Sequence, residues 1–120
     1  PAAHPWVMPD DSLAGTAVAR WMRRALPEAA IALRADSLVE LRNAARAGIG
    51  LAALPCYLGD VSEGLVRIAT PTVPEGAALW VLTHEDLRRT ARVSAFTEFM
   101  AAALARQRDL LEGRRPAVAR

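Results

Sequence analysis

The stretch from Asp36 to Pro55 contains a helix start, a helix end and an apolar run in unbroken succession. Ser37 is followed three residues later by Glu40, which is the spacing of a capping box that closes the N-terminus of a helix. This spacing predicts that a helix begins near Leu38. Gly48 can adopt the left-handed conformation that commonly ends a helix, so the helix is expected to be short. Its predicted buried face comprises Leu38, Leu41 and Ala45.

The apolar run from Ile49 to Leu54 follows this helix directly and is closed by Pro55. A continuous apolar run of this length is typical of a strand that is covered on both faces, as in a parallel sheet with helices around it. Gly50 lies inside the run and leaves room for a close neighbour. The sequence therefore predicts a strand that is covered on both faces here.

The residues before this stretch show the same alternation of strands and helices. Apolar residues around Trp6 predict a short strand, and 30–35 predicts a second strand. Between them a helix is expected to begin at a cap among 10–12 and to stop at Pro27. Its apolar face would comprise Ala14, Val18, Trp21, Met22 and Ala25. The order β-α-β-α-β predicts a parallel sheet.

The residues after Pro55 have a looser pattern. Strands are expected over 65–69 and 77–83, and the proline-containing segment 70–76 between them is the best linker candidate. Thr90 is a candidate cap for a long final helix. One row of that helix comprises Val93, Phe96, Met100, Ala103 and Gln107, with Phe99, Leu104 and Leu111 beside it. The residues beyond Glu112 show no periodic face and are expected to be frayed.

Composition limits the classes of protein that this chain can represent. All fifteen basic residues are Arg and the net charge is only +2, so the basic pI indicates a solvated Arg-rich surface rather than a DNA-binding one. No window approaches the roughly 20 apolar residues that a membrane-spanning helix needs. The single Cys56 cannot form an internal disulfide and is expected to be a small buried residue. The first residues lack both an initiator Met and a signal-peptide pattern, which suggests an internal piece of a longer chain.

Few side chains suggest catalysis. Asp10 and Asp11 are expected to cap a helix, because no other carboxylate or His stands at metal-ligand spacing. His4 and His84 lie 80 positions apart without a triad or zinc signature, and Cys56 has no supporting motif. The glycines around Ile49 follow a helix instead of preceding one, which excludes the dinucleotide-binding pattern. No catalytic residue, metal site or cofactor is therefore expected.

A binding site for a small anion is expected at the start of the central helix. The backbone N–H groups near Ser37, Leu38 and Val39, with the Ser37 hydroxyl, can hold an anion or a carboxylate. Ligands also settle at this end of the strands in open α/β sheets. The alternative is that the capping box with Glu40 already satisfies these donors.

Four segments together resemble the C-terminal part of the effector-binding domain of LysR-type transcriptional regulators. They are AGIGLAALP at 47–55, GLVRI at 64–68, LWVLTH at 79–84 and RVSAFTEF at 92–99. They occur in the family's order and at its usual separations, and they cover roughly residues 5 to 105. The resemblance implies an α/β fold of the periplasmic-binding-protein type (type 2), with a mostly parallel sheet flanked by helices and a small effector between two subdomains.

The resemblance also implies a division of the chain. Residues 1–71 would be most of the second subdomain, 72–112 the strand and helix that return to the first subdomain, and 113–120 a disordered tail. Ser37 matches the position from which the family commonly holds its effector, with Leu38 and Val39 offering adjacent backbone. The DNA-binding domain and most of the first subdomain have no counterpart in this sequence, so DNA would be bound only through a domain absent from it.

The function implied is that of a cytoplasmic bacterial sensor which binds a small, anionic effector and couples it to oligomer geometry and transcription. The final helix would present an apolar face, which predicts self-association through the Phe96 helix or the Trp21 helix. The alternatives are a transport-type periplasmic binding protein and a small α/β hydrolase or transferase. The enzyme alternative lacks a nucleophile elbow, a phosphate loop before a helix and paired catalytic carboxylates.

Overall fold

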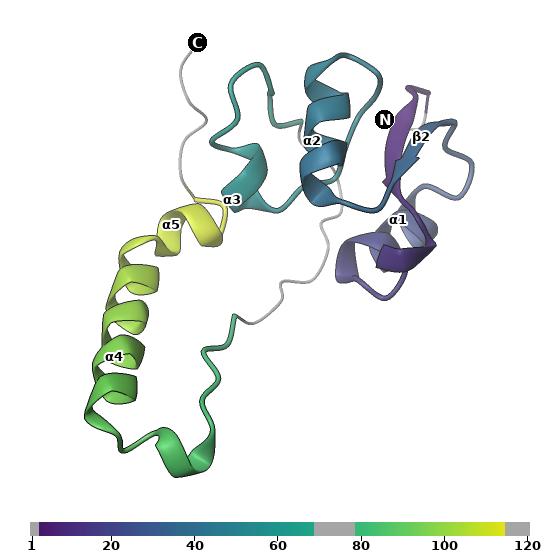
Figure 1. The fold of residues 1–120 in the computed structure, drawn as a ribbon. Helices are drawn as coiled ribbons and strands as arrows, with labels where there is room; N and C mark the ends of the chain where they lie inside the picture. Colours follow the sequence, from purple (N-terminus) through teal and green to yellow (C-terminus); the bar gives the residue numbers. More distant parts are fainter. Residues whose placement is uncertain (1–2, 69–78, 115–120) are drawn as a thin grey trace.

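The computed structural model describes residues 3–68 and 79–114, which form a body and an arm (Figure 1). The body contains residues 3–68 and the short C-terminal helix, and the arm contains residues 79–106. The elements are β1 (Trp6–Pro9), η1 (Asp11–Leu13), α1 (Ala17–Ala25), β2 (Ile31–Ala35), α2 (Leu38–Arg46), α3 (Cys56–Gly59), η2 (Glu85–Leu87), α4 (Ala91–Arg106) and α5 (Arg108–Leu111).

A small parallel sheet lies at the centre of the body. β1 pairs in parallel with β2, and Pro9 lies opposite Ala35 at the carboxyl end of the pair. On its other side β1 forms a parallel bridge to Leu51, where the Val7 N–H donates to the Leu51 carbonyl over 2.9 Å and the Leu51 N–H donates to the Pro5 carbonyl over 2.9 Å. β1 is therefore the central strand, and the expected parallel order is confirmed.

Helices cover the two faces of this sheet. Trp6 and Met8 of β1 pack against Trp21 and Met22 of α1, whereas Val7 points to the opposite face. We call the first group, Trp6, Met8, Trp21 and Met22, the α1 cluster. The second group, the α2 cluster, comprises Val7, Ala35, Leu41 and Ala44 and places α2 against the sheet. Because successive side chains of a strand point to opposite faces, one buried strand supplies both clusters.

The predicted strand over 49–54 is confirmed only in part. Leu51 and Ala53 pack against the α1 cluster, while Ala52 and Leu54 pack against the α2 cluster, so the run does contact both faces. Only Leu51 pairs with β1, however, and Ile49 is exposed. Among the described residues, β1 is the only strand that pairs with this run, and it does so through the single bridge at Leu51.

The expected cap of α1 was placed too early in the sequence. Asp10 accepts a hydrogen bond from the Ser12 N–H over 2.9 Å, but this closes the one-turn η1 and not α1. Thr16 is the N-cap of α1, and its hydroxyl accepts from the Ala19 N–H over 3.2 Å. Gly15 separates the two turns, because glycine is a poor helix former.

The two ends of α2 differ from each other in how well the sequence predicts them. Ser37 is the N-cap, but its side chain makes no capping hydrogen bond, so the predicted capping box with Glu40 is wrong. Glu40 is exposed, and donors in an exposed first turn can be satisfied by water. At the other end Gly48 has φ +79°, and the Gly48 and Ile49 N–H groups donate back to the carbonyls of residues 45 and 44. This is a Schellman motif, which confirms the predicted helix end.

The strands predicted over 65–69 and 77–83 are wrong for the residues that the structure describes. Segments 65–68 and 79–83 have no strand structure, and 79–83 is exposed throughout. Both are apolar and rich in β-prone residues, but a strand requires a neighbour that accepts and donates its backbone hydrogen bonds. The linker predicted over 70–76 and the end of the tail, 115–120, lie outside the described residues.

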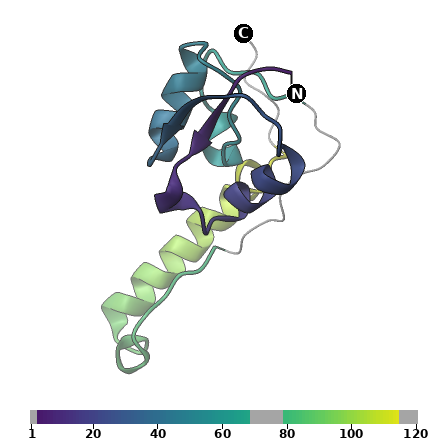
Figure 2. The ribbon, with the colours of Figure 1, turned by 90° about the vertical axis from the view of Figure 1, so that its right-hand side faces the viewer.

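The arm projects from the body (Figure 2). The extended segment 79–83 and α4 run side by side in both views, joined by η2. The radius of gyration is 17.1 Å, whereas a compact domain of this length has about 14 Å. Thr90 is the N-cap of α4, as predicted, although its side chain makes no capping hydrogen bond.

Candidate functional site

The predicted anion site lies where β2 leads into α2. Ser37 follows the carboxyl end of β2 by two residues, and its backbone is extended, with φ −133° and ψ 135°. Its carbonyl accepts from the Leu41 N–H over 3.1 Å, while its hydroxyl makes no capping bond. A ligand could therefore use both this hydroxyl and the first-turn N–H groups.

The side chains beside Ser37 differ in their surroundings. Leu38 packs against the α2 cluster and so fixes the first turn of the helix on the sheet. Val39 is 48% exposed. Glu40 is the acidic group in this first turn, and its carboxylate would oppose a second anion nearby. The site therefore suits a small ligand that approaches from the Ser37 side.

Asp10 directly follows the carboxyl end of β1, at the same edge of the sheet as the start of α2. The Asp10 N–H donates to the Ala35 carbonyl over 2.9 Å, which ties the carboxyl ends of the two strands together. The Asp10 carboxylate accepts from both the backbone N–H and the hydroxyl of Ser12. Its predicted role as a cap is confirmed, although for η1, and this carboxylate is already committed to local hydrogen bonds.

A hollow of about 460 Å³ lies on the α1 face of the body. Apolar side chains, Arg23 and Arg34 line it together with Asp10 and Asp11. The Arg23 guanidinium donates to the Ala14 carbonyl over 3.1 Å, and Arg34 donates to the Pro9 carbonyl over 3.4 Å. Ser37, Leu38 and Val39 do not line this hollow, so it is separate from the predicted anion site.

A second cluster that sequence reasoning missed joins α3 to the C-terminal end of the described chain. Arg67 pairs with Asp60 through both carboxylate oxygens and donates to the Gly113 carbonyl over 2.9 Å. The Asp60 side chain is only 7% exposed. Hydrogen bonding to Asp60 raises the pKa of Arg67 above its usual value, so the guanidinium stays charged. These residues lie outside the regular helices and strands, so no periodicity signals their pairing.

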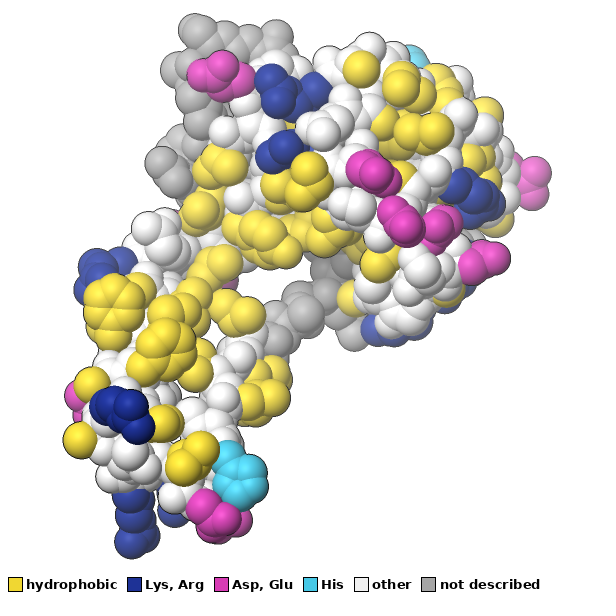
Figure 3. Space-filling model, in the orientation of Figure 1, with side chains coloured by type: hydrophobic (Ala, Val, Ile, Leu, Met, Phe, Trp, Pro, Cys, Tyr) yellow, Lys and Arg dark blue, Asp and Glu magenta, His cyan; other side chains and the backbone are white. Residues whose placement is uncertain are grey.

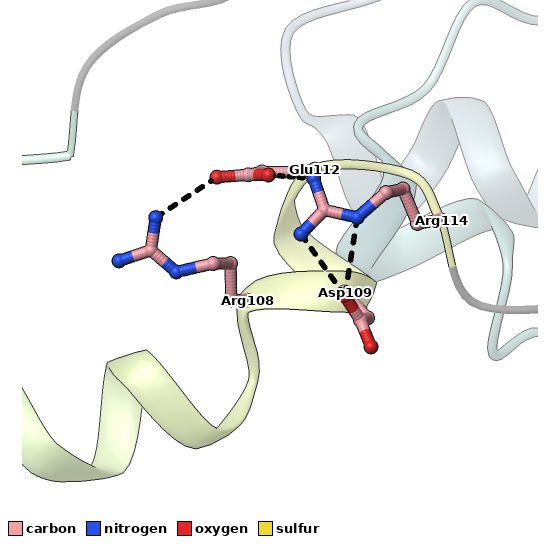
Figure 4. A network of polar contacts seen from close by, with 4 residues as sticks. All are labelled: Arg108, Asp109, Glu112 and Arg114. Carbon is pink, nitrogen blue, oxygen red and sulfur yellow. Dashed lines mark hydrogen bonds and ion pairs between the residues drawn. The ribbon is translucent and has the colours of Figure 1, made fainter.

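The neighbouring C-terminal ion pairs are surface contacts. Figure 4 shows Arg114 between Asp109 and Glu112, with Arg108 reaching the same glutamate from one turn earlier. Hydrogen bonds to Glu112 and Asp109 raise the pKa of Arg114. All four side chains are substantially exposed, and exposed ion pairs of this kind contribute little to stability.

The side chains most often used in catalysis are not brought together in the described part of the chain. His84 is exposed and caps η2, where its Nδ1 atom accepts from the Asp86 N–H over 3.2 Å. Cys56 has a free thiol and is half-buried, so it is less buried than predicted. Within residues 3–68 and 79–114, no group of three or more His, Cys, Asp or Glu residues is placed to hold a metal ion. No helix in these ranges is long and apolar enough to cross a membrane.

The family model described as the LysR substrate binding domain matches residues 2–105 of the chain. No curated protein and no solved structure gives a significant match. The matched residues include β1, α1, β2, α2 and nearly all of α4, so the family pattern spans both the body and the arm.

Proposed function

The chain belongs to the LysR substrate-binding domain family, and from this membership we propose that it is the ligand-sensing part of a LysR-type transcriptional regulator. Domains of this family belong to regulators and have a type 2 periplasmic-binding-protein-like α/β fold; the parallel sheet between α1 and α2 is consistent with that fold. The proposal excludes an enzymatic role, and it places the protein in the bacterial cytoplasm, where a regulator meets DNA.

The proposed effector is a small anion or carboxylate held at the start of α2. The observation that carries this proposal is the Ser37 hydroxyl, which stands at the N-cap without a capping bond, beside first-turn backbone donors. Leu38 and Val39 would supply backbone N–H groups to the same ligand. A helix N-terminus of this kind favours negative charge.

The proposed mechanism is a shift between two arrangements of subdomains. Residues 1–71 would act as most of the second subdomain, and 72–112 would return to the first subdomain, with 113–120 as a tail. An effector changes the balance between arrangements only in so far as it binds one of them more tightly. That balance would set the geometry of the oligomer and so the control of transcription, with DNA bound by another domain.

The binding proposal is tested by thermal unfolding with a panel of small mono- and dicarboxylates. A ligand at 100 times its Kd stabilises the folded chain by about 2.7 kcal/mol, so a binding compound raises the unfolding temperature of the wild-type protein. The substitution Ser37→Ala is expected to weaken this effect at least several-fold, because it removes the hydroxyl that we assign to the ligand. Equal stabilisation of the Ser37→Ala variant would contradict the proposed site.

Thr90→Ala is the matched control. Thr90 is also an N-cap without a side-chain capping bond, but it begins α4 in the arm. Its substitution therefore removes a comparable hydroxyl from a comparable position and is expected to leave carboxylate binding unchanged. The second candidate function is a transport-type binding protein. Sequencing the open reading frame that contains this segment distinguishes the two: an encoded helix-turn-helix domain favours the regulator, and an encoded secretory signal favours transport.

A further inference from the structure

The hollow on the α1 face of the body combines an apolar floor with charged side chains. Met8 and Ala19 line it and are only 9% and 6% exposed. Leu26 and Ala29 also line it, and both are partly buried and pack against the α1 cluster. Its volume of about 460 Å³ lies within the range of about 300–1,000 Å³ that is usual for small-molecule sites. The hollow therefore has the size and the apolar lining that a small organic ligand needs.

Two guanidinium groups in this hollow have donors to spare. Arg23 reaches from α1 to the Ala14 carbonyl, just after η1, and Arg34 reaches from β2 to the Pro9 carbonyl, just before it. Both groups are thus held beside the same short turn. Within the described residues, neither forms an ion pair with an acidic side chain. Because a guanidinium carries five N–H donors, each can still bind an anion.

The two acidic side chains of the hollow differ in how they are satisfied. The Asp10 carboxylate accepts hydrogen bonds from the N–H and the hydroxyl of Ser12. The Asp11 carboxylate is exposed and has no hydrogen bond or ion pair in the part of the chain that the structure describes. A second negative charge on a ligand would be repelled by Asp11. The hollow therefore favours a ligand with a single negative charge.

We infer that this hollow is a binding site for a small monocarboxylate with an apolar body, such as a short-chain fatty acid. The guanidinium groups of Arg23 and Arg34 hold the carboxylate, whose two oxygens match the fork of N–H donors. The hydrocarbon part covers the apolar floor and is removed from water there. Ser37 does not line the hollow, so this inference holds whether or not an effector binds at the start of α2.

The first test is an NMR titration of the wild-type chain with hexanoate. Saturable shifts of the side-chain Nε–H signals of Arg23 and Arg34 are expected. Acetate lacks the apolar body and 1-hexanol lacks the charge, so each should cause much smaller shifts at the same concentration. Absence of saturable shifts at both arginines, or equal shifts with 1-hexanol, would overturn the inference. Shifts at Ser37 alone would also overturn it, while supporting the effector site proposed above.

The arm provides an internal control in the same titration. Figure 3 shows hydrophobic side chains gathered along the arm, whereas acidic and basic side chains are interspersed with hydrophobic ones over the body. On α4, Phe96 and Phe99 are 60% and 64% exposed, so a fatty acid that binds apolar surface without specificity should shift their signals. Specific binding in the hollow leaves them unchanged. Shifts confined to the arm would contradict the inference.

The second test compares charge variants by the same titration. Arg23→Gln is expected to weaken hexanoate binding about tenfold, because a charge-assisted hydrogen bond is lost. Arg20→Gln is the matched control, because Arg20 also lies on α1 and donates to a backbone carbonyl, that of Gly15, but does not line the hollow. Asp11→Asn should strengthen binding about two- to fivefold, since it removes an exposed like charge. A variant that fails to fold cannot give such a gain. Equal affinities of the two arginine variants, or no gain in Asp11→Asn, would refute the site.

Discussion

Replacing Gly50 by Ala tests whether the close approach of residue 50 to Pro5 is needed to hold the run 49–54 beside β1. A Cβ atom at this position would lie 2.7 Å from the Pro5 carbonyl oxygen and 3.0 Å from its carbon. These are backbone atoms, so no side chain can rotate away to relieve the contact. The same carbonyl accepts the Leu51 N–H, and Val7 donates to Leu51 on the next step of the ladder. Room for the methyl group therefore requires that this pairing move or break.

The expected cost follows from these contacts. Overpacking of a tight site typically costs about 1–3 kcal/mol, and each strained hydrogen bond adds about 1 kcal/mol. We expect Gly50→Ala to lower the free energy of unfolding by about 2–4 kcal/mol, a large share of the 5–15 kcal/mol typical of a domain. With a urea m-value of about 2 kcal/mol/M, the middle of the usual range, the unfolding midpoint should fall by about 1–2 M.

The assay is urea unfolding followed by far-ultraviolet circular dichroism at a fixed protein concentration. Gly15→Ala is the matched control, because a Cβ atom there meets nothing within 4 Å and its backbone is not in the left-handed region. That substitution should leave stability unchanged or raise it by up to about 1 kcal/mol. If Gly50→Ala unfolds at the wild-type urea concentration, the close approach of residues 5 and 50 does not hold the fold together.

Three further substitutions probe other parts of the body. Leu41→Ala removes a fully buried side chain under the sheet and should cost about 2–5 kcal/mol in urea unfolding. Gly48→Ala places a side chain at φ +79° and should cost about 1–2 kcal/mol, with no loss of sheet structure by circular dichroism. Arg67→Ala leaves the buried Asp60 carboxylate unpaired and should speed amide exchange at the end of α5, whereas Arg114→Ala should not. Unchanged exchange in the Arg67 variant would show that this contact does not dock α5.

Much of the body could be predicted from local sequence. The Trp6 strand, the C-terminal part of the Trp21 helix and the Gly48 helix end lie where their patterns place them, because each depends on residues within one or two turns. The two-sided packing of 51–54 also follows from an apolar run with alternating side chains. Such short-range signals need no knowledge of distant partners.

The candidate site was predictable only in outline. The sequence places Ser37 at the start of α2, but whether its hydroxyl closes the cap depends on a rotamer and on the exposure of Glu40. The hollow beside Arg23 and Arg34 joins a helix to a strand edge, and no spacing in the sequence announces it. The contact of Arg67 with Gly113 spans 46 positions, so it could not be predicted from local spacing either.

The sequence by itself determined where the three longest helices lie and which segments are β-prone. Only the tertiary structure decided which β-prone segments become strands. Trp6–Pro9 found partners on both sides and became the central strand, while 79–83, with an equally suitable composition, stayed extended and exposed. The physical reason is that a helix satisfies its own backbone hydrogen bonds, whereas a strand needs those of a neighbour.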